Sequence, residues 1–258
     1  MPAHPPVAGA PAVAVHDLGL TIGGAQILAG VTLEVPAGEL LGVIGPNGAG
    51  KTTLFNLLSG LLTPSRGTVH LGGRDVTRDP PHRRARAGLG RTFQTSSVFP
   101  ALSVLENVRL AAQAALGGSL SLWRRPRPGD AATRVARDRL AEVGLAGRAA
   151  SLAGALAHGE KRQLEIALLL AADPAVILLD EPLAGVSAAD VPTLTDLIGR
   201  VHREYGRTVL MVEHHLEVVL DLVDRVAVLH HGQLLACDRP HLVVANPEVQ
   251  AAYLGQPV

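Results

Sequence analysis

The sequence predicts an α/β fold with a mostly parallel core sheet, and two observations carry that prediction. Short, continuously apolar runs alternate with helical stretches along much of the chain. Runs without alternation are typical of strands that are covered on both faces, as in a parallel sheet. A chain of 258 residues, 47% hydrophobic and 18% charged, is also long and apolar enough to bury such a core, so it belongs to the ordered proteins.

Four segments are the best strand candidates, namely residues 40–44, 176–180, 208–213 and 225–230. Ahead of them, residues 13–35 alternate more weakly around Gly23 and Gly24. This pattern predicts a turn inside an antiparallel edge sheet that is joined to the main sheet. Residues 1–12 are rich in proline and alanine and resemble neither a signal peptide nor a membrane anchor, so we expect a disordered tail followed by one domain over residues 13–258.

A helical subdomain is predicted to interrupt the strands at about residues 95–158. The strand-like runs stop there, and helix formers dominate residues 102–116 and 131–142. Residues 117–130 lie between these helices and hold the one tryptophan among arginines and prolines. This segment is interpreted as a solvated loop, with a lipid- or partner-facing loop as the alternative.

Composition excludes several classes of protein. The 23 basic and 23 acidic residues balance, which argues against a nucleic-acid binder that works by bulk electrostatic attraction. One cysteine, Cys237, allows no intramolecular disulfide and no cysteine-rich metal site, as fits a reducing cytosol. Mean hydropathy is high at +0.26, but the longest apolar runs end at Asp173 and Asp180, well short of the ~20 residues that a membrane span needs.

A phosphate-binding loop is the strongest motif in the chain. Residues 45–52 read GPNGAGKT and stand between the strand at 40–44 and an apolar helix at 53–59. Glycines let successive backbone N–H groups turn toward phosphate oxygens, and the helix start adds its positive dipole end. Lys51, one of only two lysines, is expected to reach the β- and γ-phosphates, and the Thr52 hydroxyl to bind Mg²⁺. The residues expected to bind nucleotide here are Gly45, Pro46, Asn47, Gly48, Ala49, Gly50, Lys51, Thr52 and Thr53.

Four further residues become candidate site residues beside such a loop. Asp180 and Glu181 end the strand at 176–180, where one carboxylate can hold Mg²⁺ and the next can activate water. Alone, such a pair would more often be a surface turn. His214 follows the strand at 208–213, at the sheet edge where α/β proteins bind ligands. Gln94, in the segment RTFQT, draws its significance only from its place between the strands and the helical insert.

In this order, the motifs resemble those of the nucleotide-binding subunit of ATP-binding cassette (ABC) transporters, over nearly all of residues 13–255. GPNGAGKT resembles the Walker A loop, ILLDEP the Walker B strand, and LAHGE at residues 156–160 the signature motif that opens a helix running to about residue 172. Gln94 is similar to the Q-loop glutamine and His214 to the switch histidine. Five motifs in the right order are far more specific than any one of them.

The resemblance implies a mechanism and a set of partners. Two such subunits, identical or different, would enclose two ATP molecules between the Walker A loop of one and the signature motif of the other. Lys51, Glu181 and His214 would be the catalytic residues, with Glu181 as the base for water. Thr52, Gln94 and Asp180 would hold Mg²⁺. Ile22, Gln94, Ala157, Gly159 and Glu160 would complete the ATP contacts.

The same resemblance places the chain at the cytoplasmic face of the cell membrane. There it would bind transmembrane permease subunits in a system that also has a periplasmic or extracellular substrate-binding protein, with no nucleic acid as a partner. Residues 88–108 and 246–255 resemble the importers of branched-chain amino acids most, with urea and short-amide importers close by. Since the transported substrate never touches this subunit, the substrate follows by analogy alone.

Four positions depart from the family pattern. Ile22 stands where an aromatic ring usually stacks on adenine, Ala157 replaces the signature serine, Ser187 replaces the D-loop acid, and His215 replaces an aspartate. Hydrolysis is still expected, because Lys51, Asp180, Glu181 and His214 are all retained. The alternative is a non-hydrolysing, ATP-gated binding module. A soluble ABC-type ATPase of DNA repair or translation is less favoured, because tandem cassettes, long coiled coils and zinc-binding cysteines are not seen.

Overall fold

The computed structural model describes residues 9–92, 98–117 and 129–254, which fall into two compact units. The first unit is built from Met1–Arg91, Ala175–Pro182 and Gly199–Val258, and the second from Thr92–Pro174 and Leu183–Ile198. The range predicted for the helical subdomain, about 95–158, lies within the second unit. Residues 1–8 of the predicted tail lie outside the described residues, and the first strand begins at Val13.

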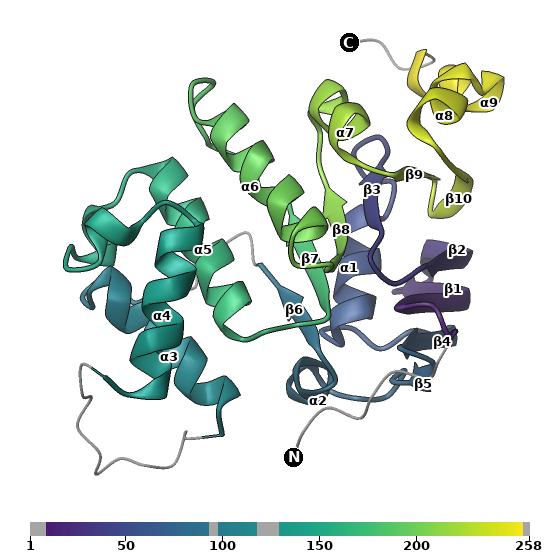
Figure 1. Ribbon diagram of the computed structural model, residues 1–258. Helices are drawn as coiled ribbons and strands as arrows, with labels where there is room; N and C mark the ends of the chain where they lie inside the picture. The colour runs from purple at the N-terminus through teal and green to yellow at the C-terminus, as the bar shows by residue number, and fades with distance from the viewer. Residues whose placement is uncertain (1–8, 93–97, 118–128, 255–258) are drawn as a thin grey trace. The chain divides into compact units, whose positions relative to one another are not determined.

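A six-stranded sheet forms the centre of the first unit (Figure 1). Its order is β10-β9-β3-β8-β7-β6, and every neighbouring pair is parallel except β9 with β10. The strands are β3 (Leu40–Ile44), β6 (Leu89–Arg91), β7 (Val176–Asp180), β8 (Thr208–Val212), β9 (Arg225–His230) and β10 (Gln233–Asp238). The predicted α/β class with a mostly parallel sheet is therefore confirmed.

Burial explains why these strands lack alternation. All five residues are buried in each of β3, β7 and β8. Helix α1 (Lys51–Ser59) and helix α7 (Leu216–Leu222) both contact the sheet. Gly42 allows the approach of α7, since a Cβ atom there would stand 2.5 Å from Cγ1 of Val219. With side chains on both faces covered, an apolar residue is favoured at every strand position.

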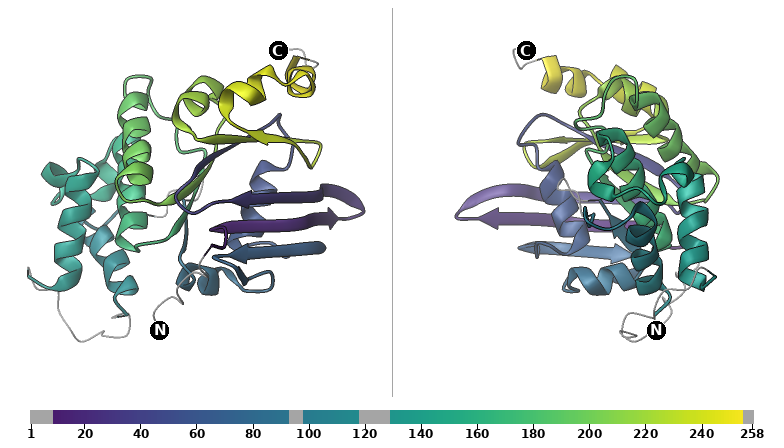
Figure 2. Two further views of the ribbon diagram at one scale, coloured as in Figure 1. Left: turned by 45° about the vertical axis from the view of Figure 1, so that its right-hand side comes forward. Right: turned by 90° about the vertical axis from the view of Figure 1, so that its left-hand side faces the viewer.

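The antiparallel strands form a second sheet of the same unit, with the order β2-β1-β4-β5. The strands are β1 (Val13–Ile22), β2 (Ala25–Val35), β4 (Arg66–Leu71) and β5 (Arg74–Asp75), and the left view of Figure 2 shows β1, β2 and β4 as purple and blue arrows. The sequence predicted the β1–β2 turn but was wrong in joining these strands to the main sheet. The two sheets remain separate because they meet through an apolar core cluster that includes Val15, Leu33, Val69, Leu178 and Leu229.

Three helices that pack against one another make up most of the second unit. They are α3 (Val104–Ala115), α4 (Ala131–Glu142) and α5 (His158–Ala171), and short turns at Ala146–Arg148 and Ala153–Ala155 lie between α4 and α5. Side-chain caps set two of the starts: Ser103 Oγ accepts from Glu106 N–H at 3.1 Å, and Asp130 Oδ1 from Thr133 N–H at 2.7 Å. Most of the segment predicted as a loop, at 117–130, lies outside the described residues.

Four further helices complete the described part of the chain. They are α2 (Pro81–Arg86), α6 (Val191–Arg203), α8 (Pro240–Ala245) and α9 (Pro247–Leu254). Proline occupies an early position in α2 and α8, where its missing N–H costs no helical hydrogen bond. Within the described ranges, no helix has the length and apolar character to cross a membrane.

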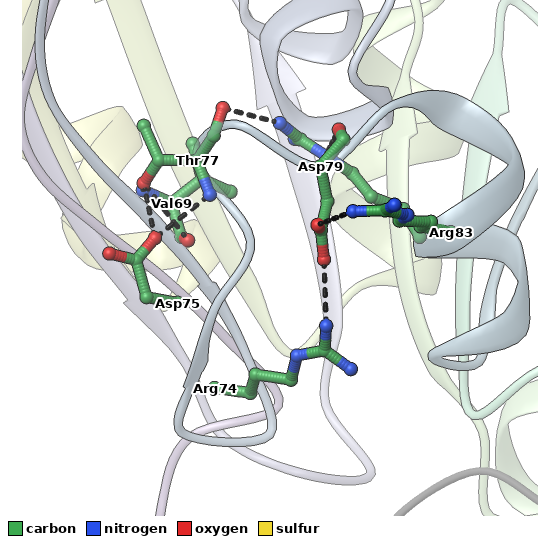
Figure 3. A network of polar contacts seen from close by, with 7 residues as sticks. Val69, Arg74, Asp75, Thr77, Asp79 and Arg83 are labelled. Carbon is green, nitrogen blue, oxygen red and sulfur yellow. Dashed lines mark hydrogen bonds and ion pairs between the residues drawn. The ribbon is translucent and has the colours of Figure 1, made fainter.

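Arg84 of α2 anchors the carboxyl end of α1. Its side chain is fully buried, and its guanidinium donates to the carbonyl oxygens of Leu57, Leu58, Thr77 and Asp79. The last carbonyls of a helix lack partners in regular helical bonding, so Arg84 supplies donors there, beside the Gly60 N–H that also reaches Leu57 O. Figure 3 shows the neighbouring polar network, in which Asp79 also pairs with Arg74 and Arg83.

We expect Arg84→Met to lower the free energy of unfolding by about 3 kcal/mol, because two buried and two half-buried hydrogen bonds from the guanidinium are lost at once. Arg83→Met is the matched control. Arg83 is 63% exposed and pairs with Asp79 at 3.7 Å, so its loss is expected to cost less than about 0.5 kcal/mol. Urea denaturation of both variants measures the difference, and equal losses would contradict the anchoring role.

Candidate nucleotide site

The loop at residues 45–50 joins β3 to α1 in a shape that only glycine allows at several positions. Gly45 has φ of 153°, and a Cβ atom there would lie 2.1 Å from the carbonyl oxygen of Leu229. Gly50 has φ of 101°, and a Cβ atom there would meet Leu28 at 2.6 Å. Gly48 has φ of 78° but faces open space, with nothing within 4 Å of a Cβ atom. The loop is therefore packed on one side and open at its tip.

The start of α1 presents backbone donors beside this tip. Gly50 is the N-cap residue and provides no side-chain cap, so the first N–H groups of the helix have no acceptor within it. Ala49 N–H donates to Pro46 O at 3.2 Å, and Gly232 N–H donates to Ala49 O at 3.1 Å, which holds the loop closed against the β9–β10 turn. Thr52 is exposed in the first turn. This arrangement fits a bound phosphate.

Lys51 lies buried across the loop. Its ammonium donates to the carbonyl oxygens of Gly45 at 2.6 Å and Pro46 at 3.0 Å, so it is held at the inner side of the turn. Burial lowers the pKa of the Lys51 ammonium, and the nearby Glu181 carboxylate opposes that effect. A charged amine that is held only by neutral carbonyls can gain a stronger partner when an anion enters the loop.

Strand register brings three motifs to one edge of the sheet. Val43 of β3 is paired with Val212 of β8, and Val212 is paired with Asp180 of β7. The loop starts two residues after Val43, and His214 stands two residues after Val212. The carboxyl ends of these three adjacent strands therefore place the loop, the carboxylates and the histidine side by side.

Glu181 and His214 are in direct contact. His214 Nε2 lies 2.9 Å from Glu181 Oε1, so the ring donates to the carboxylate. Glu181 has φ of 49°, a strained conformation for a residue with a side chain, and its N–H donates to Val212 O at 2.9 Å. Behind them, buried Glu213 accepts from His214 N–H at 3.1 Å and contacts His215 Nδ1 at 3.3 Å. The Glu181–His214 contact is thus formed without any ligand, whereas His215 contacts Glu213.

Asp180 is almost completely buried and is paired with a residue that the sequence did not single out. Arg91 Nη2 lies 2.8 Å from Asp180 Oδ2, and the two side chains are 7% and 1% exposed. The sequence treated Arg91 only as a neighbour of Gln94, which lies outside the described residues. No local pattern marked Arg91, because β6 has only three residues and the partner carboxylate lies 89 positions later.

The signature residues form their own group in the second unit. Ala157 precedes α5, and its N–H donates to Glu160 Oε2 at 2.9 Å. Arg148 pairs with Glu160 at 2.7 Å, and the two hydrogen bonds, that of Arg148 first, lower the pKa of Glu160. Gly159 packs closely on Asp190, since a Cβ atom there would stand 3.1 Å from Asp190 Oδ2. Asp190 in turn accepts from Ser187 Oγ at 2.7 Å. Arg148, Ala157, Gly159, Glu160 and Asp190 line one pocket of the second unit.

Ile22 is the last of the predicted contacts in the first unit. It ends β1 beside the Gly23–Gly24 turn, is paired with Ala25, and is 55% exposed. A large apolar side chain so exposed is available to a flat, apolar partner such as a base, with less contact area than an aromatic ring. The structure leaves its role a prediction.

Comparison with known proteins identifies this arrangement. The sequence matches the ABC transporter family over residues 28–184, which include the loop, the signature residues and the end of β7. This chain belongs to the ABC transporter family. It is 36% identical over 251 residues, or 95% of its length, to the high-affinity branched-chain amino acid transport ATP-binding protein BraF of Pseudomonas aeruginosa, 98% of which is covered. LivG of Escherichia coli K12, named for the same transport, matches to the same extent.

Solved structures give the same answer. An ATP-binding cassette of an ABC transporter in its ADP conformation superposes with a TM-score of 0.83 at 29% identity, covering 95% of this chain and 98% of that one. A nucleotide-free cassette superposes with a TM-score of 0.81 at 28% identity, covering 95% and 99%. The chain is therefore the nucleotide-binding subunit of an ABC transporter, an ATPase coupled to transport.

We expect Gly45→Ala to lower the free energy of unfolding by about 3 kcal/mol, because the new methyl group collides with the Leu229 carbonyl. Gly48→Ala meets no neighbour and is expected to cost about 1 kcal/mol for the left-handed backbone alone. Thermal unfolding without nucleotide compares them. If Gly48→Ala is the more damaging, the packed and open sides of the loop have been assigned the wrong way round.

Lys51→Arg is expected to weaken ATP binding at least about tenfold, since a planar guanidinium fits poorly where a compact ammonium meets two carbonyls. The other lysine supplies the control. Lys161 of α5 is only partly buried, so Lys161→Arg should bind ATP like the wild type. Titration with a fluorescent ATP analogue measures both affinities, and unchanged affinity in Lys51→Arg would show that the loop is misread.

Proposed function

We propose that this chain binds ATP on the loop at residues 45–53 and hydrolyses it with Lys51, Glu181 and His214. The observation that carries the proposal is the shared edge of β3, β8 and β7, where the loop, the histidine and the carboxylates meet. Backbone N–H groups and Lys51 would bind the phosphates, and Ile22 would contact the base. Gln94 retains its predicted contact with the nucleotide and the metal, although it lies outside the described residues.

Thr52 and Asp180 fit a magnesium ion. Both are oxygen donors of the kind that Mg²⁺ prefers, and Thr52 is exposed in the first turn of α1, at the end of the phosphate-binding loop. Asp180 is buried and already placed opposite a cation, Arg91. Bound Mg²⁺ would neutralise charge on the phosphate oxygens. The chain itself supplies the hydroxyl and the carboxylate that hold it.

Glu181 and His214 divide the proton chemistry. The Glu181 carboxylate is the base that accepts a proton from the attacking water, and its strained backbone fixes its direction. His214, bonded to Glu181 through Nε2, holds that carboxylate and is 46% exposed, so it can also donate to a phosphate oxygen. A preformed pair of this kind lowers the cost of arranging the groups at the moment of reaction.

A second ATP-binding subunit, identical or different, completes the site in this proposal. The start of α5 offers Ala157, Gly159 and Glu160 to the nucleotide of the other copy. The charge of Glu160 is balanced by Arg148, so a carboxylate at this position does not repel phosphate as a lone one would. The loss of the serine hydroxyl at Ala157 leaves the backbone N–H groups of the helix start as the donors.

The cargo of the transporter is proposed from the relatives. BraF and LivG are named for high-affinity transport of branched-chain amino acids, and the likeness extends over 95% of this chain. We therefore propose an importer of these or of related small amides or urea, with this subunit on transmembrane permeases at the cytoplasmic face of the membrane. A substrate-binding protein outside the membrane would deliver the cargo.

A non-hydrolysing, ATP-gated module is the second candidate. The observations that favour it are Ala157 at the signature position and Ser187, whose hydroxyl is bound to Asp190 and not offered to a partner. In that case ATP would hold two copies together without turnover. Glu181 and its contact with His214 are both present, so the hydrolytic function is the better supported of the two.

Glu181→Gln tests the choice between them. The amide keeps the size of the side chain but cannot accept the proton, so ATP turnover by the purified chain should fall at least about 100-fold while ATP-dependent dimerisation persists. Phosphate release and size-exclusion chromatography with ATP measure the two properties. Equal turnover in wild type and variant, with dimerisation in both, would reject hydrolysis by Glu181.

A further inference from the structure

Arg91 makes a set of contacts that reach from the sheet to α1. Its Nη2 donates to Asp180 Oδ2 at 2.8 Å, while Nη1 donates to Asn56 Oδ1 at 2.8 Å and to Ser59 Oγ at 2.7 Å. The guanidinium carbon also lies 5.9 Å from the centre of the Phe55 ring. One planar fork thus links β6 and β7 to the second half of the helix that carries the phosphate loop.

The charge of Asp180 depends on this contact. The Asp180 side chain is 1% exposed, and a carboxylate so removed from water is stable only beside a cation or strong donors. Lys51, the other buried cation of this edge, is bound to the carbonyls of Gly45 and Pro46. Arg91 thus contributes a positive charge that balances Asp180 in the chain without a metal.

One buried carboxylate cannot balance two cations at full strength. If Mg²⁺ is held through Asp180, as the proposed function requires, then two positive charges face one buried carboxylate. They repel each other, and the ion pair must lengthen or the metal must bind more weakly. A stronger Arg91–Asp180 ion pair therefore lowers the affinity of the site for Mg²⁺.

We infer that Arg91 is a positioning residue which holds Asp180 in place without metal and sets the Mg²⁺ affinity of the site by competing for the charge of the Asp180 carboxylate. This inference rests on the proposed role of Asp180. The hydrogen bonds of Arg91 to Asn56 and Ser59 keep the guanidinium close to Asp180, so that the ion pair can form again when Mg²⁺ dissociates. The site then stays ordered through both states.

Arg91→Met tests this inference, because methionine fills the space without the charge. The measurement is the Mg²⁺ concentration at the midpoint of fluorescent ADP binding, beside ADP binding in EDTA. We expect the Mg²⁺ midpoint to fall about tenfold, with the affinity in EDTA changed less than about threefold. The melting temperature without Mg²⁺ should fall, and Mg²⁺ with ADP should raise it by more than in the wild type.

Controls separate competition from a merely structural role. Arg109→Met removes another buried arginine, which pairs with Glu106 in the second unit, and should lower stability with no shift of the Mg²⁺ midpoint. Arg91→Lys keeps the charge and should stay near the wild-type midpoint. Arg91→Gln is neutral but keeps donors for Asn56 and Ser59, and serves if the methionine variant does not fold. A midpoint that is unchanged or raised in the neutral variants overturns the inference.

Asp180→Asn distinguishes failure of this inference from failure of the proposed function. If the Mg²⁺ midpoint is unchanged in Asp180→Asn, Asp180 does not hold the metal, and the proposed metal site is itself wrong. If Asp180→Asn shifts the midpoint strongly while neutral variants of Arg91 do not, the metal site stands and only the competition by Arg91 is rejected.

Discussion

The parallel register of three neighbouring strands is the constraint on which the rest of this structure depends. Strand β3 lies between β9 and β8, and it is buried on both faces, so the chain can turn only at its ends. Parallel pairing with β8, and of β8 with β7, brings three carboxyl ends to one edge. A slip of one residue in either pair would turn every strand side chain to the opposite face and separate the histidine from the carboxylates. The strand register that packs the core is therefore also the one that brings the loop, the histidine and the carboxylates together.

Much of this could be predicted from the sequence, because the patterns that mark these elements lie within short, contiguous segments. Strands 40–44, 176–180 and 225–230 were predicted with the bounds that the structure has, because a strand buried on both faces consists of a continuous run of mostly apolar residues. The phosphate loop is a contiguous motif, so its glycines identify it without a fold. The structure gives each of these glycines a separate physical reason, which the motif alone does not.

What was missed depends on partners far away in the chain. Strand β6 has three residues, and β5 has two, so neither carries a period that a sequence can show. Arg91 acquires its importance from Asp180, 89 positions later, and Arg84 from carbonyl oxygens of α1 that no side-chain pattern records. The contact of Glu160 with Arg148, 12 positions away, likewise could not be predicted from the sequence. Pairings of this kind are fixed by tertiary structure and not by local preference.

The burial of Lys51 also has a chemical consequence. An amine reacts with acylating reagents only when it is deprotonated and accessible, and Lys51 is bound to two carbonyls and shielded, although burial lowers its pKa. The chain has only one other lysine side chain, Lys161, which is partly accessible on another helix. The ratio of the acylation rates at Lys51 and Lys161 therefore reports how often the phosphate loop opens. Lys161 serves as the internal reference for the reagent. Few proteins offer so small a background for a chemical probe of a single loop.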